Sequence, residues 1–163
     1  MDETRLAVYG VTGLILAVTL LSGPLVGAVD LTEESTCDAP VGSGSATVTV
    51  DSLPEKATIS KGKFGSEVYY LDVPDGQATI TNVSGQPLLS YDLSIPEMGF
   101  SAGPTLFLCD GQSATQTLSI RKSTFEEEDI QADSYNATLS VTLRADGSET
   151  VVREKSITVE VEE

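Results

Sequence analysis

The sequence predicts an all-β domain, an antiparallel β-sandwich of immunoglobulin-like layout with eight or nine short strands, preceded by one N-terminal apolar helix. Three observations lead to this fold class. Apolar and polar residues alternate through most of the chain after residue 45, which places one face of each strand in a core and the other in water. Turn residues interrupt these runs about every 8–15 residues, as in a sandwich. After Val29, no stretch shows a long apolar period of 3.6 residues, the pattern of an amphipathic helix.

The expected strands are the alternating runs, taken in order along the chain. Leu106–Leu108 differs from the others, because three consecutive apolar residues predict a strand that is buried on both faces. The dipeptide Asp146-Gly147 lies between two runs and is the strongest hairpin signal. Residues Ser123–Asp133 are the least strand-like part of the domain, where a helical turn or an extended loop is expected. The runs are Ala46–Val50, Ala57–Ile59, Tyr69–Val73, Ala78–Ile80, Leu89–Ile95, Leu106–Leu108, Leu118–Ile120, Leu139–Leu143 and Ile157–Val161.

A long uncharged segment precedes the predicted domain. Leu6–Val29 contains 24 residues and no charge, a length sufficient to span a bilayer as a helix. Arg5 precedes it and acidic residues follow it, so the acidic bulk of the chain is expected on the outer side of a membrane. Residues 1–29 are therefore interpreted as a signal peptide or membrane anchor, 30–45 as a polar linker and 46–163 as the β-sandwich domain.

Three roles are open for the uncharged segment. In a cleaved signal peptide, Leu6–Leu21 forms the apolar region and Val26-Gly27-Ala28 supplies small residues for the peptidase. In a retained anchor, the full uncharged length spans the bilayer. The third role is the apolar helix of a filament subunit. The lead Asp2–Arg5 before a long apolar run resembles the start of archaeal pilins and archaellins, although Leu6 stands where those proteins have a small residue.

Acidic residues dominate the charge balance. The chain has 25 Asp and Glu against 9 Lys and Arg, a net charge of −16, which opposes binding to nucleic acid and to anionic lipid headgroups. Few lysines, many acids and many threonines together resemble the composition of exported acidic proteins of extremely halophilic archaea, and no specific family is matched. The Debye length is about 3 Å in molar salt, so self-repulsion is screened there and the fold is expected to weaken in low salt.

The two cysteines, Cys37 and Cys109, are expected to form a structural disulfide. An even pair without CxxC spacing, in a chain that its leader sends out of the cell, is typical of such a bond. The bond would close a loop of about 73 residues and staple the N-terminal leader to the domain. The chain-entropy model assigns it roughly 4 kcal/mol of stability. Two free thiols are the alternative.

Several enzyme chemistries are excluded by missing residues. The chain has no His, which removes Ser–His–Asp and Cys–His catalysis and the commonest transition-metal ligand. Two cysteines cannot close a zinc site, and no glycine pattern matches a phosphate-binding loop. A pair of carboxylates could still hydrolyse a sugar bond, but five Tyr, four Phe and no Trp leave few rings for sugar stacking. The chain is therefore expected to be no enzyme and to use no cofactor.

Two kinds of candidate site remain. The acidic run Glu126–Asp129 offers oxygen ligands for Ca²⁺, but its spacing does not match an EF-hand loop, so a solvated acidic loop is expected and no metal site is assigned. The sequons Asn82-Val83-Ser84 and Asn136-Ala137-Thr138 are candidate glycan acceptors in an exported chain. Their alternative is that Asn82 and Asn136 are simple polar residues at strand ends.

These observations predict an exported, non-enzymatic structural or interaction module, extracellular or on the outer face of the cell membrane. Its partners are expected to be other surface or envelope proteins and not nucleic acid, with the membrane reached through the N-terminal segment if that is retained. Self-association is compatible with the sequence. The alternatives are a subunit of a pilus-like or matrix filament and a small-ligand or calcium-binding domain.

Overall fold

The computed structural model describes residues 37–63 and 67–162. The predicted signal peptide or anchor, its apolar helix and the first part of the predicted linker lie outside these residues. Among the residues that are described, no helix is long and apolar enough to cross a membrane.

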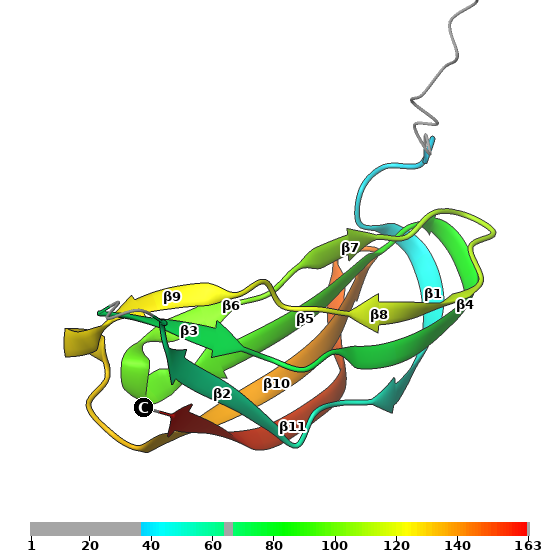
Figure 1. The fold of residues 1–163 in the computed structure, drawn as a ribbon. Helices are drawn as coiled ribbons and strands as arrows, with labels where there is room; N and C mark the ends of the chain where they lie inside the picture. The colour runs from blue at the N-terminus through cyan, green and yellow to red at the C-terminus, as the bar shows by residue number, and fades with distance from the viewer. Residues whose placement is uncertain (1–36, 64–66, 163) are drawn as a thin grey trace, which may run out of the picture. The chain divides into compact units, whose positions relative to one another are not determined.

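Eleven strands form two sheets in the described part of the chain (Figure 1). The small sheet contains β1 (Ser43–Ser52), β4 (Gly76–Gln86) and β8 (Ala114–Leu118), in the order β1-β4-β8. The large sheet contains β2 (Lys56–Lys61), β3 (Val68–Asp72), β5 (Leu88–Ile95), β6 (Phe100–Ala102), β7 (Thr105–Phe107), β9 (Ser123–Glu126), β10 (Ser134–Ala145) and β11 (Ser148–Glu162). Its order is β6-β5-β10-β11-β2-β3-β9, and β7 also pairs with β5. Two single-turn 3-10 helices are η1 (Pro96–Met98) and η2 (Glu127–Asp129).

The predicted β-sandwich is confirmed, and its strand order follows an immunoglobulin-like layout. Strand β4 pairs with β8 in one sheet, whereas β5 pairs with β10 in the other, so the chain crosses repeatedly between sheets as in a Greek key. Strands β10 and β11 form a hairpin beside β5, as strands F and G lie beside strand C in that layout. Paired strands are antiparallel except β2 and β11, which run parallel.

Tyr135, at the start of β10, adds a second mark of this layout. Its ring is buried, and its hydroxyl oxygen accepts the backbone N–H groups of Gln131 at 2.6 Å and Ala132 at 3.0 Å. A tyrosine that enters strand F and bonds to the backbone a few residues upstream is the tyrosine corner of immunoglobulin-like sandwiches. These bonds fix the path of the chain into β10.

One core lies between the two sheets, built from the inward residues of the alternating runs. In β5, buried and half-buried residues alternate at every position from Leu88 to Ile95, as a strand with one face in the core requires. A fully buried Leu or Ile contributes roughly 1.5–3 kcal/mol of transfer free energy. Both sheets supply fully buried side chains, among them Ala78, Ile80 and Leu118 from the small sheet and Ile59, Leu71, Leu93, Leu139 and Val159 from the large one.

The dipeptide Asp146-Gly147 forms the predicted two-residue hairpin between β10 and β11. Ala145 pairs directly with Ser148, and φ is 48° at Asp146 and 74° at Gly147. Two positive φ values define the type I′ turn, which Asp and Gly tolerate best. The Asp146 side chain also accepts the N–H of Gly44 at 2.8 Å, so the turn is tied to the start of β1.

Several local predictions differ from the structure. Strand β8 ends at Leu118 and does not reach Ile120, and β9 lies within Ser123–Asp133, where a helical turn or a loop was expected. The strand count is higher than eight or nine because β6 and β9 have three and four residues, too few to show an alternation. Leu106–Leu108 is not buried on both faces: β7 ends at Phe107, which is 57% exposed because it points to the outer face, opposite to half-buried Leu106 and buried Leu108. Strand β1 begins at Ser43, inside the predicted linker, since small residues pair there with the end of β4.

Candidate functional site

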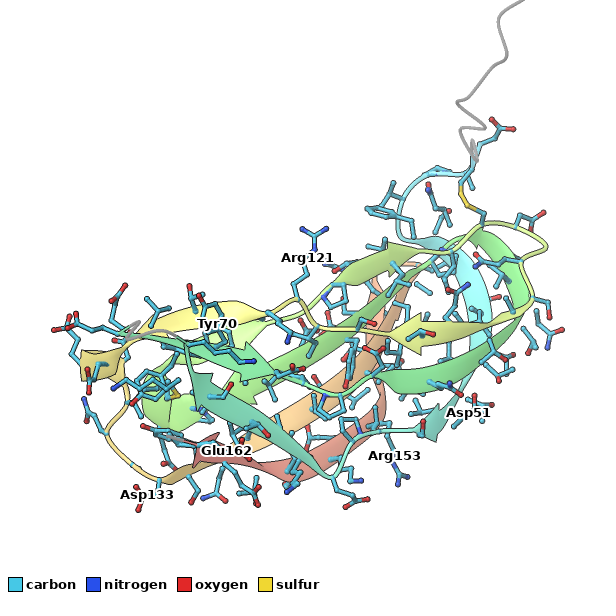
Figure 2. All side chains as sticks on the ribbon, viewed as in Figure 1. Asp51, Tyr70, Arg121, Asp133, Arg153 and Glu162 are labelled. Carbon is cyan, nitrogen blue, oxygen red and sulfur yellow. A yellow bond between two sulfur atoms is a disulfide. The ribbon has the colours of Figure 1, made fainter. Side chains whose placement is uncertain are left out.

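Cys37 and Cys109 form the predicted disulfide, the yellow bond in Figure 2. Their Cα atoms are 5.3 Å apart, within the range that such bonds require. Cys109 opens the loop between β7 and β8, which is held by three hydrogen bonds. The Gln112 N–H donates to the Cys109 carbonyl at 2.9 Å, the Cys109 N–H donates to Gln112 Oε1 at 3.1 Å, and the Gly111 N–H donates to the Val83 carbonyl at 3.1 Å. The disulfide therefore joins the start of the domain to a well-anchored loop.

Two of the exposed apolar side chains, Val41 and Phe107, lie close to the bonded cysteines along the chain. Val41, Phe107 and Val151 are 61%, 57% and 56% exposed, and Tyr70 at 39% completes the set of large exposed apolar residues in the described chain. Val41 follows Cys37 by four residues, and Phe107 precedes the other cysteine by two. We name the part of the sandwich that carries the disulfide, Val41 and Phe107 the Cys37 end.

The first sequon asparagine, Asn82, lies inside β4 on the outer face of the small sheet. It is exposed, and its φ of 53° falls at a bulge where β4 holds one residue more than β1. Asn adopts this left-handed backbone more readily than most residues. Its Nδ2 donates to Thr47 Oγ1 at 3.4 Å. Asn82 is therefore an accessible asparagine within a strand, not at its end.

The second sequon asparagine, Asn136, lies near the start of β10 and is also exposed. It stands between buried Tyr135 and buried Ala137, so it points to the outer face of the large sheet. Its Nδ2 donates to Glu97 Oε1 at 3.5 Å. The two sequons thus lie on opposite outer faces of the sandwich, and glycan attachment stays a prediction at both.

The acidic run Glu126–Asp129 forms the end of β9 and the turn η2. Asp129 Oδ2 accepts the N–H of Glu126 at 3.1 Å, and the Glu126 side chain caps the same turn in return. Glu127 pairs with Lys61 at 3.2 Å. Three of the four carboxylates are therefore occupied in local structure. No group of three or more His, Cys, Asp or Glu suited to hold a metal ion is found among the described residues.

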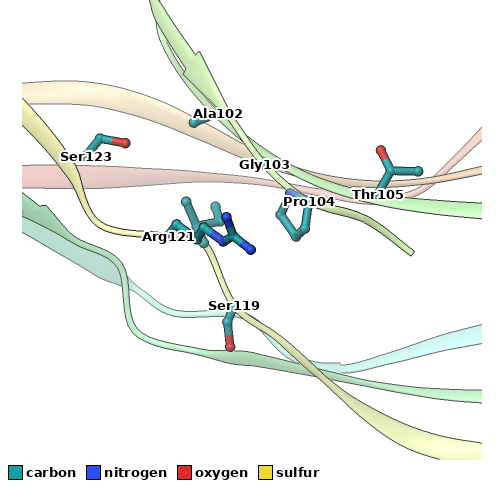
Figure 3. Close-up of a pocket in the computed structure, with 8 residues that line it drawn as sticks. Ala102, Gly103, Pro104, Thr105, Ser119, Arg121 and Ser123 are labelled. Carbon is teal, nitrogen blue, oxygen red and sulfur yellow. The ribbon is translucent and has the colours of Figure 1, made fainter. Parts of the chain in front are cut away.

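A surface hollow of about 460 Å³ lies between the β6–β7 link and the β8–β9 link (Figure 3). Arg121 lies over it, and its guanidinium group is exposed. The other lining residues are small, apolar or hydroxyl-bearing, and none is acidic: Ala102, Gly103, Pro104, Thr105, Ser119, Ile120 and Ser123. This hollow lacks the paired carboxylates that sugar hydrolysis needs.

A second hollow, of about 330 Å³, lies on the outer face of the large sheet and contains Asp92 and Glu149. Partial burial raises the pKa of the Asp92 carboxyl group, and the negative charge of Glu149 raises it further. The cation Arg144 lines the same hollow, and the hydroxyl groups of Ser90, Thr105, Ser140 and Thr142 complete its polar lining. The carboxylates and hydroxyl groups of this hollow can form hydrogen bonds with polar groups of another molecule.

Comparisons with known proteins do not place the chain in a family. No family model matches the sequence, and no curated protein matches it. Among solved structures, the N-terminal domain of PorA is similar with a TM-score of 0.31 and 10% sequence identity, over 72% of this chain and 98% of that chain. The class of protein is therefore defined by its own fold, a β-sandwich of immunoglobulin-like layout with a disulfide at one end.

Proposed function

We propose that the chain is an exported, non-enzymatic interaction module, held at the outer face of a membrane by its N-terminal segment or released from it. The Cys37–Cys109 disulfide carries this proposal, because such bonds form and persist outside the reducing cytosol. Cys37 follows the uncharged segment Leu6–Val29 by eight residues, a spacing that suits a domain folding directly after export. Other surface or envelope proteins are the proposed partners.

The outer face of the small sheet supports a role in protein contact. Strands β1, β4 and β8 contain one charged residue, Asp51, although the net charge of the chain is −16. Thr49, Thr79 and Thr115 stand directly beside one another across the three strands. Thr79 Oγ1 donates to Asp51 Oδ2 at 2.7 Å and lies 3.4 Å from Thr115 Oγ1. Hydroxyl groups that already have partners cost less to desolvate, so this face is suited to burial against a second protein.

The intact mass of the native protein, measured with and without reduction, tests the export proposal. A gain of two hydrogens on reduction is expected from the disulfide, and a chain that begins near Val29 would be a released domain. A chain that retains Leu6–Val29 would be anchored. Excess mass would report glycans on Asn82 or Asn136. A fully reduced native protein that is recovered in the cytosolic fraction would contradict export.

A filament or matrix subunit is the second candidate, and the sheet edges favour it. Within the described residues, strands β1 and β8 each pair only with β4, so both present backbone groups along one side to which an extended segment of another protein can add. Sedimentation of the native protein in high salt distinguishes the candidates. A filament sediments rapidly, whereas an isolated module stays near the size of one chain.

A further inference from the structure

We infer that the Cys37 end is a membrane-contact face, where Phe107 and Val41 enter the interfacial layer of a bilayer with zwitterionic headgroups. The inference rests on the proposed function in its anchored form, in which residues Leu6–Val29 remain attached. It goes further by assigning an orientation to the domain and a lipid partner to named side chains.

The two principal side chains of this face project from neighbouring positions. Val41 forms an isolated bridge with Gln86, and Phe107 is the register partner of Leu88. The N–H that follows Phe107 donates to the Pro87 carbonyl at 3.0 Å. Val41 and Phe107 are therefore both attached to the short crossing of the chain from β4 to β5, which holds them at the surface beside the disulfide.

A third exposed apolar residue lies toward the same end. Val151 pairs with Thr142, four residues beyond the hairpin turn at Asp146-Gly147, and that turn bonds to the start of β1. Tyr70, the remaining large exposed residue, lies toward the opposite end of the domain in Figure 2. Single exposed apolar residues are ordinary on a protein surface. Here they concentrate on the end that the disulfide ties to the N-terminal segment.

Chain length limits how far this end of the domain can lie from the bilayer in the anchored form. From Val29 to Cys37 there are eight Cα-to-Cα steps, which reach at most about 29 Å when fully extended. The disulfide then fixes Cys37 to the loop after β7. Strand β11 alone has 15 residues and is about 50 Å long. In the anchored form that we propose, Cys37 therefore stays within about 29 Å of the end of the uncharged segment, a shorter distance than the length of β11.

The charged residues at this end determine which lipid headgroups it can approach. Exposed Asp38, Asp110 and Asp146 outnumber Arg144, which pairs with Leu88 as Phe107 does. Anionic headgroups repel such an excess of carboxylates. Zwitterionic headgroups do not, and apolar side chains still gain by entering the boundary between headgroups and acyl chains. A bilayer rich in anionic lipid is therefore expected to hold this face less closely than one of phosphatidylcholine.

A single-tryptophan experiment tests the inference, because the chain contains no Trp. The full chain with Phe107→Trp is reconstituted in phosphatidylcholine vesicles, with and without lipids brominated on their acyl chains. The emission is expected at shorter wavelength than in water and is quenched by the brominated lipid. Val41→Trp is expected to behave in the same way. Tyr70→Trp, exposed at the other end, is the matched control and is expected to emit as in water without quenching.

Two results overturn the inference, and they can be told apart. If the chain floats with the vesicles but Trp at 107 and 41 emits like the control at 70, the contact face is wrong and the anchor stands. If the chain does not float with the vesicles, the proposed membrane anchor is wrong, and the proposed contact face is then wrong as well. Each variant is first shown to gain two hydrogens on reduction, which reports that its disulfide has formed.

Discussion

Tyr91 and Tyr135 are both buried, but their hydroxyl groups have opposite surroundings. The Tyr135 hydroxyl accepts two backbone N–H groups in the tyrosine corner. The Tyr91 hydroxyl, on a fully buried side chain of β5, has no hydrogen-bond partner among the described residues. A paired hydroxyl stabilises a fold, whereas a buried hydroxyl without a partner costs the free energy of its lost hydration.

Replacing each tyrosine by phenylalanine is therefore expected to change stability in different directions. Tyr135→Phe leaves two N–H groups without their acceptor and is expected to lower the free energy of unfolding by roughly 1–3 kcal/mol. Tyr91→Phe removes an unpaired group and is expected to leave that free energy unchanged or to raise it. Urea unfolding at fixed salt measures both. Equal losses in the two variants would contradict the distinction.

Burial of Tyr91 also predicts a loss of stability at high pH. Desolvation raises the pKa of this hydroxyl to about 12, and the charge of Asp75 adds to the shift. Between pH 10 and 12 the unfolded chain ionises at this residue while the folded chain does not, so stability present below pH 10 is lost as the pH rises. The melting temperature is expected to fall in this window less steeply in Tyr91→Phe than in the original chain. Identical slopes would exclude Tyr91 as the cause.

For strands and turns, the sequence pattern predicted the features that depend on residues close to one another in the chain. The hairpin at Asp146-Gly147 was predictable because two positive φ values restrict the residue types. The turn η2 within Ser123–Asp133 was predictable as a break in alternation. The pairing of β9 with β3 was not, since four residues carry no measurable period and their partner lies far away in the sequence. The tyrosine corner was not predictable from the residues around it, because the Tyr135 hydroxyl bonds to backbone N–H groups, which every residue except Pro carries.

The candidate site was predicted less completely than the fold. Cys37 and Cys109 could be paired because no other cysteine competes. The exposure of Phe107 could not be predicted, since a short apolar run looks the same in a strand buried on both faces and in one with an exposed outer face. Spacing alone also could not place Asn82 and Asn136 on opposite faces, because the sheet to which a strand belongs is set by its distant partners.

Removing the disulfide is expected to destabilise the domain strongly. The bond joins residues 72 apart in sequence, and the chain-entropy model gives such a loop roughly 4 kcal/mol, a large share of the 5–15 kcal/mol typical of a whole domain. In guanidinium unfolding, the free energy of unfolding of the double variant Cys37→Ser, Cys109→Ser is expected to be lower by about that amount. The reduced original chain is the control and is expected to match it. A loss below about 1 kcal/mol would mean that the unfolded chain gains little freedom when this loop opens.

For the whole molecule, charge is the dominant long-range term. The four ion pairs of the described residues, Lys56–Glu160, Lys61–Glu127, Lys122–Asp72 and Lys155–Glu55, involve at least one exposed partner each, and exposed pairs contribute about 0–1 kcal/mol apiece. A net charge of −16 leaves an excess of carboxylates that repel one another. Repulsion is therefore expected to exceed these attractions in low salt.

The melting temperature is accordingly expected to fall as salt is diluted from about 1 M to 0.1 M, as the Debye length grows from about 3 to 10 Å. The triple variant Glu128→Gln, Glu154→Gln, Glu162→Gln removes exposed charges outside the four ion pairs. It is expected to melt higher than the original chain in 0.1 M salt and to respond less to dilution. A melting temperature that does not depend on salt would remove the support for the halophile-like interpretation of the composition.

The parallel pairing of β2 with β11 has a consequence for the time at which the protein can fold. Strand β2 begins at Lys56, but its partner register runs from Thr158 to Glu162, so most of the domain must be synthesised before the two strands can meet. Pairings of such long sequence separation form slowly, because the intervening chain must first be brought together. A chain that leaves the ribosome and enters a translocation channel amino-terminus first therefore reaches that channel before its large sheet can close. In the exported form that we propose, the large sheet therefore closes only after β11 has been synthesised, and the chain can enter the channel before that sheet forms.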